Sequence, residues 1–181
     1  MKADGSIKSI VIFFSRADEN YYGGRKKYLK VGNTEIVANS IKNIVGADMF
    51  KVERKEPYPE EYSDVITLAK EEIKNNLRPE IKSYLPSIAD YDIIFIGSPI
   101  YWDTMPACMF TLLETLDFRE KVVMPFTTHE GSGLGSVVSD LKKICKGGAV
   151  KEGLAIYGPN AKKSTKEIRE WIRENTKYVI L

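Results

Sequence analysis

The chain has 181 residues and a formal net charge of +2 at pH 7. Hydrophobic residues make up 43% of it and charged residues 29%, a balance that is typical of globular domains and excludes a disordered chain. The length suits one well-buried domain and is short for two. We therefore expect a single domain over residues 1–181.

The cysteines and the apolar runs indicate the subcellular location of the protein. Cys108 and Cys145 are far apart and form no C-x-x-C pair, so we expect two reduced thiols rather than a disulfide. The N-terminal residues lack the hydrophobic region of a signal peptide, and the apolar runs are too short to span a bilayer. The sequence predicts a cytoplasmic protein with no membrane partner.

Most basic residues are scattered among acidic ones. The exception is a cluster formed by residues 25–27 and Lys30, which we interpret as solvated loop charge because it is not part of an aromatic and basic face. No nucleic-acid partner is therefore expected. His129 is the single histidine, and a lone histidine does not indicate a metal site.

Short apolar runs alternate with amphipathic helices along the chain. The first run, residues 10–14, is β-branched and aromatic, as expected for a strand that is buried on both faces of a parallel sheet. A polar, glycine-containing stretch follows over residues 16–32, and Asn33 and Thr34 are then predicted to cap a helix. The later strands are expected near residues 49–52, 93–96, 122–126 and 154–157, and the later helices near residues 62–73, 105–116, 135–145 and 168–172.

This alternation predicts an α/β fold, a doubly wound five-stranded parallel sheet of order 2-1-3-4-5 with helices on both faces. Pro125 cannot donate a ladder hydrogen bond, so we expect it at the exit of its strand. In the predicted order the first and third strands are neighbours whose connections leave in opposite directions. Ligands bind at such a point, so a crevice is expected between Ser15 and Ser98.

One end of this crevice has the residues of an anion site. A helix start offers unpaired N–H groups and partial positive charge at Asn33 and Thr34, and Ser15 adds a hydroxyl. Arg16 either adds a guanidinium or turns to solvent. The alternative is that Asn33 or Thr34 is only a helix cap. No Walker A sequence is present, so hydrolysis of a nucleoside triphosphate has no support.

The other end has flat aromatic surface. Tyr101 and Trp102 follow a strand in a loop that Pro99 restricts, and two exposed rings favour a planar ligand, although either ring could instead pack into the core. Residues 127–133 are expected to form the opposite wall, because glycines let backbone amides approach a ligand. His129 either is a plain loop side chain or, when protonated, stabilises a reduced ring. A phosphorylated, planar cofactor fits both ends, and flavin mononucleotide (FMN) is the leading candidate.

With these residues, the chain resembles the flavodoxin-like superfamily, and within it proteins with a long first loop. The resemblance rests on residues 15–21 with 32–38, on residues 97–106 and on residues 131–133, and it covers essentially the whole chain. It implies FMN as cofactor and no catalytic side chain, because the flavin performs the chemistry. The implied cofactor-binding residues are Ser15, Arg16, Gly32, Asn33, Thr34, Pro99, Ile100, Tyr101, Trp102, Thr128, His129, Gly131, Ser132 and Gly133.

The chain departs from the flavodoxin pattern in three respects. Residues 16–32 form an insertion, which we expect either to cover the site or to contact a partner. Electron-carrier flavodoxins are strongly acidic, whereas a net charge of +2 gives no comparable steering of basic partners. The loop after the fourth strand lacks the aromatic residue that often sandwiches the flavin. One ring face is therefore expected to be open to a substrate, as in flavodoxin-like NAD(P)H:quinone reductases.

The predicted function is that of an FMN-binding redox protein, either an electron carrier or a small flavin-dependent oxidoreductase. Its partner would be a redox protein, a small electron acceptor or NAD(P)H, and the protein itself could form a homodimer. Two alternatives stay open: an NAD(P)H:quinone-type reductase proper, and a non-redox module that binds another phosphorylated ligand on the same fold.

Overall fold

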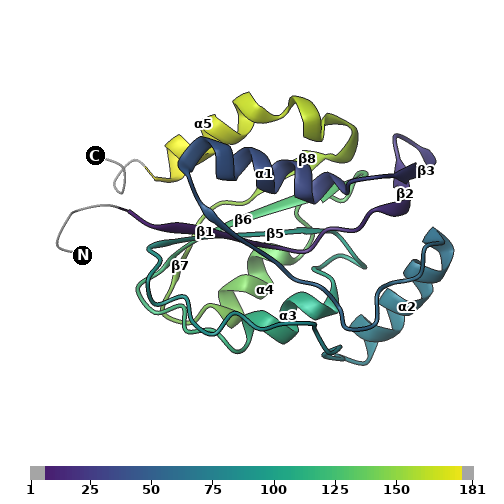
Figure 1. Cartoon of the computed structure of the whole chain (residues 1–181), viewed down its shortest axis with the longest axis horizontal. Helices are drawn as coiled ribbons and strands as arrows, with labels where there is room; N and C mark the ends of the chain where they lie inside the picture. The colour runs from purple at the N-terminus through teal and green to yellow at the C-terminus, as the bar shows by residue number, and fades with distance from the viewer. Residues whose placement is uncertain (1–6, 177–181) are drawn as a thin grey trace.

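The structure is a computed structural model, and it describes residues 7–176. A six-stranded sheet forms the centre of the molecule (Figure 1), and its strand pairs are parallel. Its order is β4-β1-β5-β6, and both β7 and β8 pair with β6. The strands are β1 (Ser9–Phe13), β4 (Asp48–Lys51), β5 (Ile93–Pro99), β6 (Val122–His129), β7 (Ala149–Val150) and β8 (Leu154–Tyr157).

The predicted α/β fold class and the strand order are confirmed, and β7 is a short addition to the expected five strands. Figure 1 shows α1 and α5 on one face of the sheet and α3 and α4 on the other. A 3₁₀ helix, η1, leads from β8 into α5. The helices are α1 (Asn33–Val45), α2 (Tyr62–Lys74), α3 (Ala107–Leu113), α4 (Val137–Ile144), η1 (Gly158–Lys163) and α5 (Thr165–Asn175).

The sheet separates two hydrophobic cores. Successive side chains of a strand point to opposite faces, so Val11 and Phe13 of β1 join the core beneath α1 and α5. Ile10 and Ile12 of the same strand join the core on the side of α3 and α4. The continuous apolar run of β1 is explained by burial on both faces.

Residues 16–32 contain a β-hairpin that the sequence did not predict. Its strands are β2 (Asp18–Tyr22) and β3 (Arg25–Leu29), which pair antiparallel in a separate two-stranded sheet. Gly23 and Gly24 form the turn with φ of 62° and 84°, the left-handed conformation that tight hairpins favour. Neither strand shows an apolar alternation, which is why the sequence pattern indicated only a polar loop.

The position predicted for Pro125 is wrong, because this residue lies in the middle of β6. The Val122 N–H donates to the Asp92 carbonyl on the β5 side (3.0 Å). Amide directions alternate along a strand, so the Pro125 nitrogen faces the opposite side, between the end of β7 and the beginning of β8. The missing N–H therefore interrupts no ladder there, and the strand continues.

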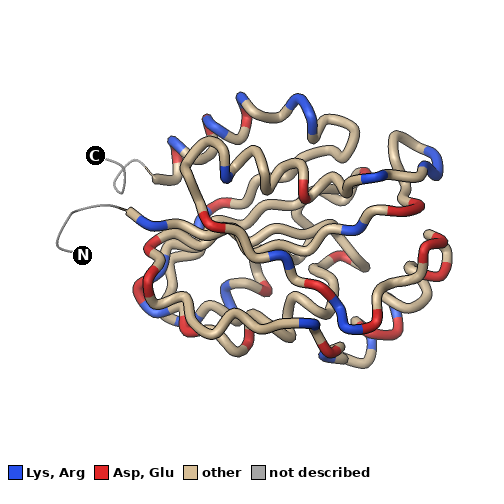
Figure 2. The backbone as a smooth tube through the Cα atoms, viewed as in Figure 1, with Lys and Arg blue, Asp and Glu red and all other residues tan. Residues whose placement is uncertain are grey.

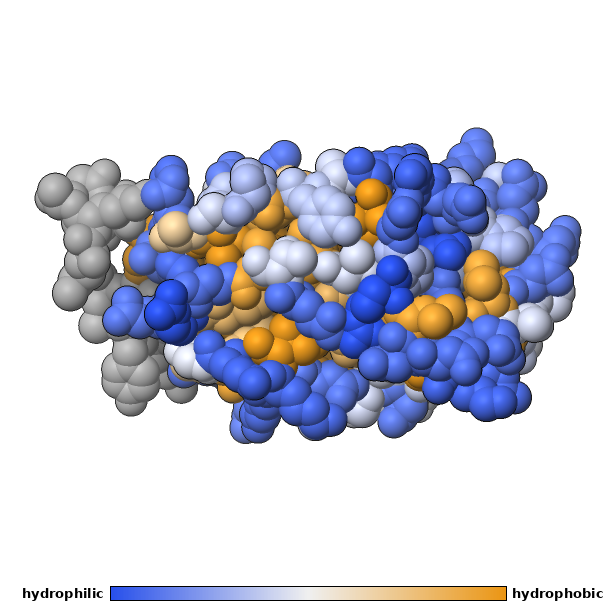
Figure 3. Space-filling model, turned by 90° about the horizontal axis from the view of Figure 1, so that it is seen from below, coloured by the Kyte–Doolittle hydropathy of each residue, from blue (hydrophilic) through white to orange (hydrophobic). Residues whose placement is uncertain are grey.

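The surface is mixed in charge and hydropathy. Figure 2 shows both signs of charge over the whole molecule, with basic residues at the hairpin turn. On the face in Figure 3, hydrophobic residues form small areas among hydrophilic ones. Cys108 and Cys145 are buried and free, as expected. Within residues 7–176, no helix has the length and apolar character to cross a bilayer.

Candidate functional site

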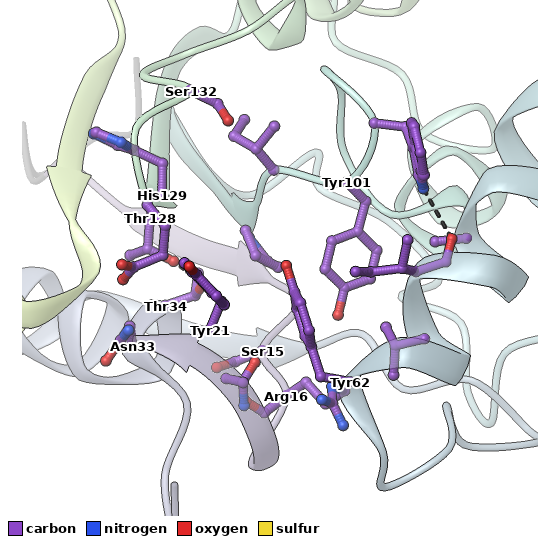
Figure 4. Close-up of a pocket in the computed structure, with 18 of the residues that line it drawn as sticks. Ser15, Arg16, Tyr21, Asn33, Thr34, Tyr62, Tyr101, Thr128, His129 and Ser132 are labelled. Carbon is purple, nitrogen blue, oxygen red and sulfur yellow. Dashed lines mark hydrogen bonds between the residues drawn. The ribbon is translucent and has the colours of Figure 1, made fainter. Parts of the chain in front are cut away.

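A cavity of about 370 Å³ opens at the carboxyl ends of β1, β5 and β6 (Figure 4). This is the edge at which the predicted crevice was expected, and the volume is in the range of ligand pockets. Thr34 and Trp102, which are far apart in the sequence, line the same cavity. Its lining consists of Ser15, Arg16, Asn20, Tyr21, Leu29, Asn33, Thr34, Tyr62, Val65, Ile66, Ala69, Pro99, Ile100, Tyr101, Trp102, Asp103, Thr128, His129, Glu130 and Ser132.

The polar end of the cavity lies at the beginning of α1. Gly32 occupies the cap position and has no side chain to donate or accept, so the prediction that Asn33 and Thr34 cap α1 is wrong. Ser15, two residues after β1, supplies the contact from outside the helix: its Oγ accepts the Glu35 N–H at 3.1 Å. The Thr34 hydroxyl is instead 2.7 Å from the Thr128 hydroxyl of β6. Hydroxyls and helix-start amides therefore gather at one point.

Gly32 does not line the cavity, but it permits this arrangement. A Cβ at this position would lie 2.3 Å from Ser15 Oγ and 2.4 Å from the Arg16 carbonyl oxygen, closer than real Cβ contacts. The glycine thus lets the start of α1 approach the end of β1 closely. Ser98 is buried and does not line the cavity, although the crevice was predicted to reach it.

Arg16 lines the cavity but does not turn to solvent, since it is only 8% exposed. Its Nη1 donates to the Pro59 carbonyl (2.9 Å) and to the Glu60 carbonyl (3.2 Å), and its Nη2 donates to the Glu19 carbonyl. The guanidinium therefore joins the hairpin to the chain before α2. Three of its five N–H donors are used in this way, while its Nε is buried with no hydrogen-bond partner among the described residues.

A tight turn presents the two aromatic residues of the loop after β5. Tyr101 and Thr104 exchange both backbone hydrogen bonds, at 2.8 and 3.1 Å. Trp102 and Asp103 between them have positive φ, 47° and 70°. Non-glycine residues in this region are strained and persist only where their surroundings hold them. Such strain is concentrated at functional sites.

Two contacts hold the strained turn. The Ser136 N–H and hydroxyl both donate to the Asp103 carbonyl, at 2.6 and 2.9 Å. On the other side, the Trp102 indole N–H donates to the Ile66 carbonyl of α2 at 2.9 Å, the dashed line in Figure 4. The turn is therefore fixed between α4 and α2.

The two rings have different surroundings. Tyr101 packs edge-on against Phe14 and Tyr58, with centroids 6.2 and 5.5 Å away, and burial raises the pKa of its hydroxyl. Trp102 stays 46% exposed, with the Lys70 ammonium 4.9 Å from its ring centroid. Tyr101 thus packs against the core and also lines the cavity, whereas Trp102 lies at the rim.

The end of β6 and the loop after it form the facing wall, through Thr128 and His129 of the strand and Ser132 of the loop. Gly131 and Gly133 do not line the cavity; their positive φ values, 138° and 63°, shape the loop. His129 Nδ1 accepts the Gly131 N–H at 3.0 Å, and burial lowers the pKa of the imidazole. The neutral form is therefore favoured at His129, against the hypothesis of a protonated imidazole.

The β2–β3 hairpin and α2 together form a wall of the cavity that was not predicted, and we call it the outer wall. On α2, Tyr62, Val65, Ile66 and Ala69 form one apolar stripe along the cavity. Their spacing was visible in the sequence, but periodicity does not distinguish a stripe that covers a core from one that lines a cavity. The hairpin contributes Asn20, Tyr21 and Leu29.

Glu130 and Asp103 also line the cavity, although neither was among the implied cofactor-binding residues. Glu130 Oε2 accepts the Gly23 N–H of the hairpin turn at 2.7 Å, while its Oε1 is buried and has no hydrogen-bond partner among the described residues. Within residues 7–176, no group of three His, Cys, Asp or Glu side chains could hold a metal ion.

Comparison with known proteins agrees with this geometry. The flavodoxin family matches residues 27–175, most of the chain. A candidate flavoprotein from Bacteroides eggerthii is 28% identical, with a TM-score of 0.75 over 93% of this chain and 98% of that one. A flavoprotein from Lactobacillus acidophilus in complex with FMN is 21% identical, with a TM-score of 0.62 over 87% and 98%. No curated protein matches. The chain belongs to the flavodoxin family.

Proposed function

We propose that the chain binds FMN in this cavity and acts as a redox protein in electron transport. One observation carries the proposal: a single cavity joins a cluster of hydroxyls at a helix start to an aromatic turn. The two ends match a phosphate and a planar ring system. The family and the FMN complex of the L. acidophilus relative support the same cofactor.

The polar end fits a phosphate without a basic side chain. The amides at the start of α1 and the hydroxyls of Ser15, Thr34 and Thr128 would hold it, with the helix dipole favouring the negative charge. Either member of the Thr34–Thr128 pair can be the donor, so one hydroxyl hydrogen can turn to an anion. Arg16 would act mainly by holding the hairpin.

The aromatic end fits a planar ring system. Pro99, Tyr101 and Trp102 would pack against the ring, and the loop after β6 would approach its polar edge. FMN, when bound, supplies one- and two-electron chemistry. The chain's own part is to bind, orient and tune it. The Glu130 carboxylate disfavours added negative charge at the cavity and a neutral His129 does not offset it, which would lower the reduction potential.

The proposal includes a cytoplasmic location. It is supported by Cys108 and Cys145, whose thiols are free and buried, because reduced cysteines are typical of that compartment. Burial raises the pKa of each thiol to about 12, so both stay protonated and take no part in the redox step. The electron donor would be a redox protein.

The absorption spectrum of the purified protein tests the proposal. We expect a yellow protein that releases FMN on denaturation, and an apoprotein that takes up FMN more tightly than riboflavin, which lacks the phosphate. Quenching of flavin fluorescence measures both affinities. A colourless protein that leaves added FMN fluorescence unchanged would refute FMN binding and favour a module for another phosphorylated ligand.

A further inference from the structure

We propose that Tyr21 and Tyr62 form a second aromatic wall of the cofactor cavity, and that this wall excludes a second planar molecule such as a nicotinamide. The inference rests on the proposed FMN site and goes beyond it. It assigns to the outer wall the role of an aromatic stacking partner. The loop after β6 does not supply one, because residues 130–135 include no aromatic residue.

The two rings come from elements that are distant in the sequence. Tyr21 lies on β2 and Tyr62 is the first residue of α2, yet their ring centroids are 5.9 Å apart and the rings are stacked at 27°. Both line the cavity, and Figure 4 shows the Tyr62 ring between Tyr21 and Tyr101. Burial raises the pKa of Tyr62, and the Tyr21 hydroxyl donates to the Gly24 carbonyl at 3.0 Å. The stacked pair is thus a built part of the lining.

The base of the hairpin is fastened to α2. Glu19 Oε2 accepts the Tyr62 N–H at 3.1 Å and lies 3.0 Å from the Lys26 ammonium. The Tyr62 amide and Lys26 lower the pKa of Glu19, so the carboxylate stays ionised. The Glu19 N–H also donates to the Glu60 carbonyl at 3.3 Å. These contacts hold β2, which carries Tyr21, against the residue that carries the other ring.

The tip of the hairpin is fastened on the other side of the cavity. The Gly23 N–H donates to Glu130 in the loop after β6. The hairpin therefore spans the cavity from α2 to the facing loop and is held at both ends. A wall tied in this way keeps its position, because displacing it breaks a contact to a carboxylate at one end or the other.

The enclosed space decides which reductants can act. A cavity of about 370 Å³ lies near the lower limit for pockets that hold one small ligand. Hydride transfer moves two electrons and a proton together from the nicotinamide C4 to the acceptor, so the two rings must stack. Single-electron transfer makes and breaks no bond: the donor loses one electron and the cofactor gains it. The wall excludes the first process and leaves the second.

The test compares Tyr21→Ala, Tyr62→Ala and the double variant with Tyr28→Ala. Tyr28 lies on the same hairpin, is 63% exposed and does not line the cavity. Tyr62→Leu keeps apolar bulk without the ring, and far-UV circular dichroism checks folding. FMN titrations give the dissociation constants and the fluorescence yield of bound FMN. Stopped-flow mixing with NADPH, and separately with dithionite as a one-electron donor, gives the reduction rates.

We expect each cavity-lining substitution, Tyr62→Leu included, to weaken FMN binding about tenfold and to raise its fluorescence. The double variant should be reduced by NADPH at least about tenfold faster than wild type, because a stacked nicotinamide can now enter. Dithionite rates should stay within about twofold, and Tyr28→Ala should behave as wild type. Two results would refute the proposed wall and leave the proposed FMN binding intact. One is a wild-type protein that binds FMN and is reduced rapidly by NADPH, and the other is a set of variants with wild-type FMN affinity and fluorescence. Wild type that takes up no FMN overturns the proposed function, and the wall with it.

Discussion

The sheet and the outer wall of the cavity are held by different kinds of contact. In β1 and β5, nearly every side chain is buried between two helical layers. The outer wall depends on directed polar contacts from Arg16, Glu19 and Glu130. Apolar burial is spread over many residues, whereas a polar contact is lost with one side chain. The position of the sheet therefore depends on many small contributions, whereas the position of the outer wall depends on a few side chains.

A buried ionic contact on the outer wall shows most clearly how the wall depends on single side chains. Glu72 of α2 is 2% exposed, accepts the Tyr58 hydroxyl at 2.5 Å and lies 2.7 Å from Arg54. The Arg54 guanidinium lies over the Tyr58 ring, and that ring makes an edge-to-face contact with Tyr101. Glu72 thus joins α2 to the aromatic residues behind the cavity. Breaking this contact tests how far the wall depends on one group.

The largest effect is expected for Glu72→Gln. Removing one partner of a buried ion pair leaves the other charge uncompensated, so the free energy of unfolding should fall by about 3 kcal/mol. Urea denaturation measures it. The matched control is Glu80→Gln, whose pair with Lys55 (2.6 Å) is exposed, and no measurable change is expected there. Equal losses in the two variants would contradict the comparison.

The anion end is tested by the double substitution Ser15→Ala with Thr34→Ala. Hydrogen bonds to a charged group contribute about 1.5–3 kcal/mol each, so the loss of two should weaken FMN binding more than about 100-fold. Riboflavin affinity should not change, because riboflavin has no phosphate. Arg16→Met should weaken FMN less, since most of its donors bond the carbonyls of Glu19 in the hairpin and of Pro59 and Glu60 before α2. A larger loss for Arg16→Met in fluorescence titrations would place the guanidinium on the phosphate.

Apolar patterning predicted the scaffold correctly for a physical reason. Runs such as residues 93–96 are apolar because both faces of the strand are buried, and the carboxyl edge then brings Ser15, Thr34 and Trp102 to one cavity. The outer wall could not be predicted in the same way. Polar hairpin strands have no hydrophobic period, and partners such as Glu130 and Gly23 are more than 100 residues apart.

The start of α1 shows a second limit of prediction from the local sequence. Asn33 and Thr34 have the composition of a cap, but the cap depends on tertiary contacts that the local sequence does not contain. The Ser15 hydroxyl accepts the Glu35 N–H, and the Thr34 hydroxyl forms a hydrogen bond with the Thr128 hydroxyl. The residues were still assigned to the correct place, because both functions need polar groups at a helix start.

Trp102→Ala tests whether the Trp102 ring contacts the cofactor or only packs against α2. The substitution removes a ring from the cavity and the indole donor from the Ile66 carbonyl. Loss of one stacking partner should weaken FMN binding about tenfold and shift its reduction potential. Titration and redox potentiometry measure the two quantities. If both stay at wild-type values, Trp102 only packs against α2.

Glu130→Gln separates the charge of Glu130 from its contact with the hairpin. The amide oxygen can still accept the Gly23 N–H, but the negative charge at the cavity is gone. The FMN reduction potential should rise by up to about 60 mV, since 59 mV corresponds to a tenfold change for one electron. Glu80→Gln, far from the lining, serves as the control. A potential that stays at the wild-type value would show that the charge of Glu130 does not act on the cofactor.

The smallest effect concerns His129. Burial lowers its pKa below the ordinary 6.5, and the charge of Glu130 opposes the shift. A lowered pKa in the folded state means that the stabilisation from neutral His129 is present above pH 6.5 and is lost as the pH falls through the folded value. Nuclear magnetic resonance titration of the imidazole should therefore give a value under 6.5, and wild type should lose stability relative to His129→Gln in acid. A pKa above 6.5 would show that Glu130 dominates, and it would restore the protonated imidazole as a neighbour of the cofactor.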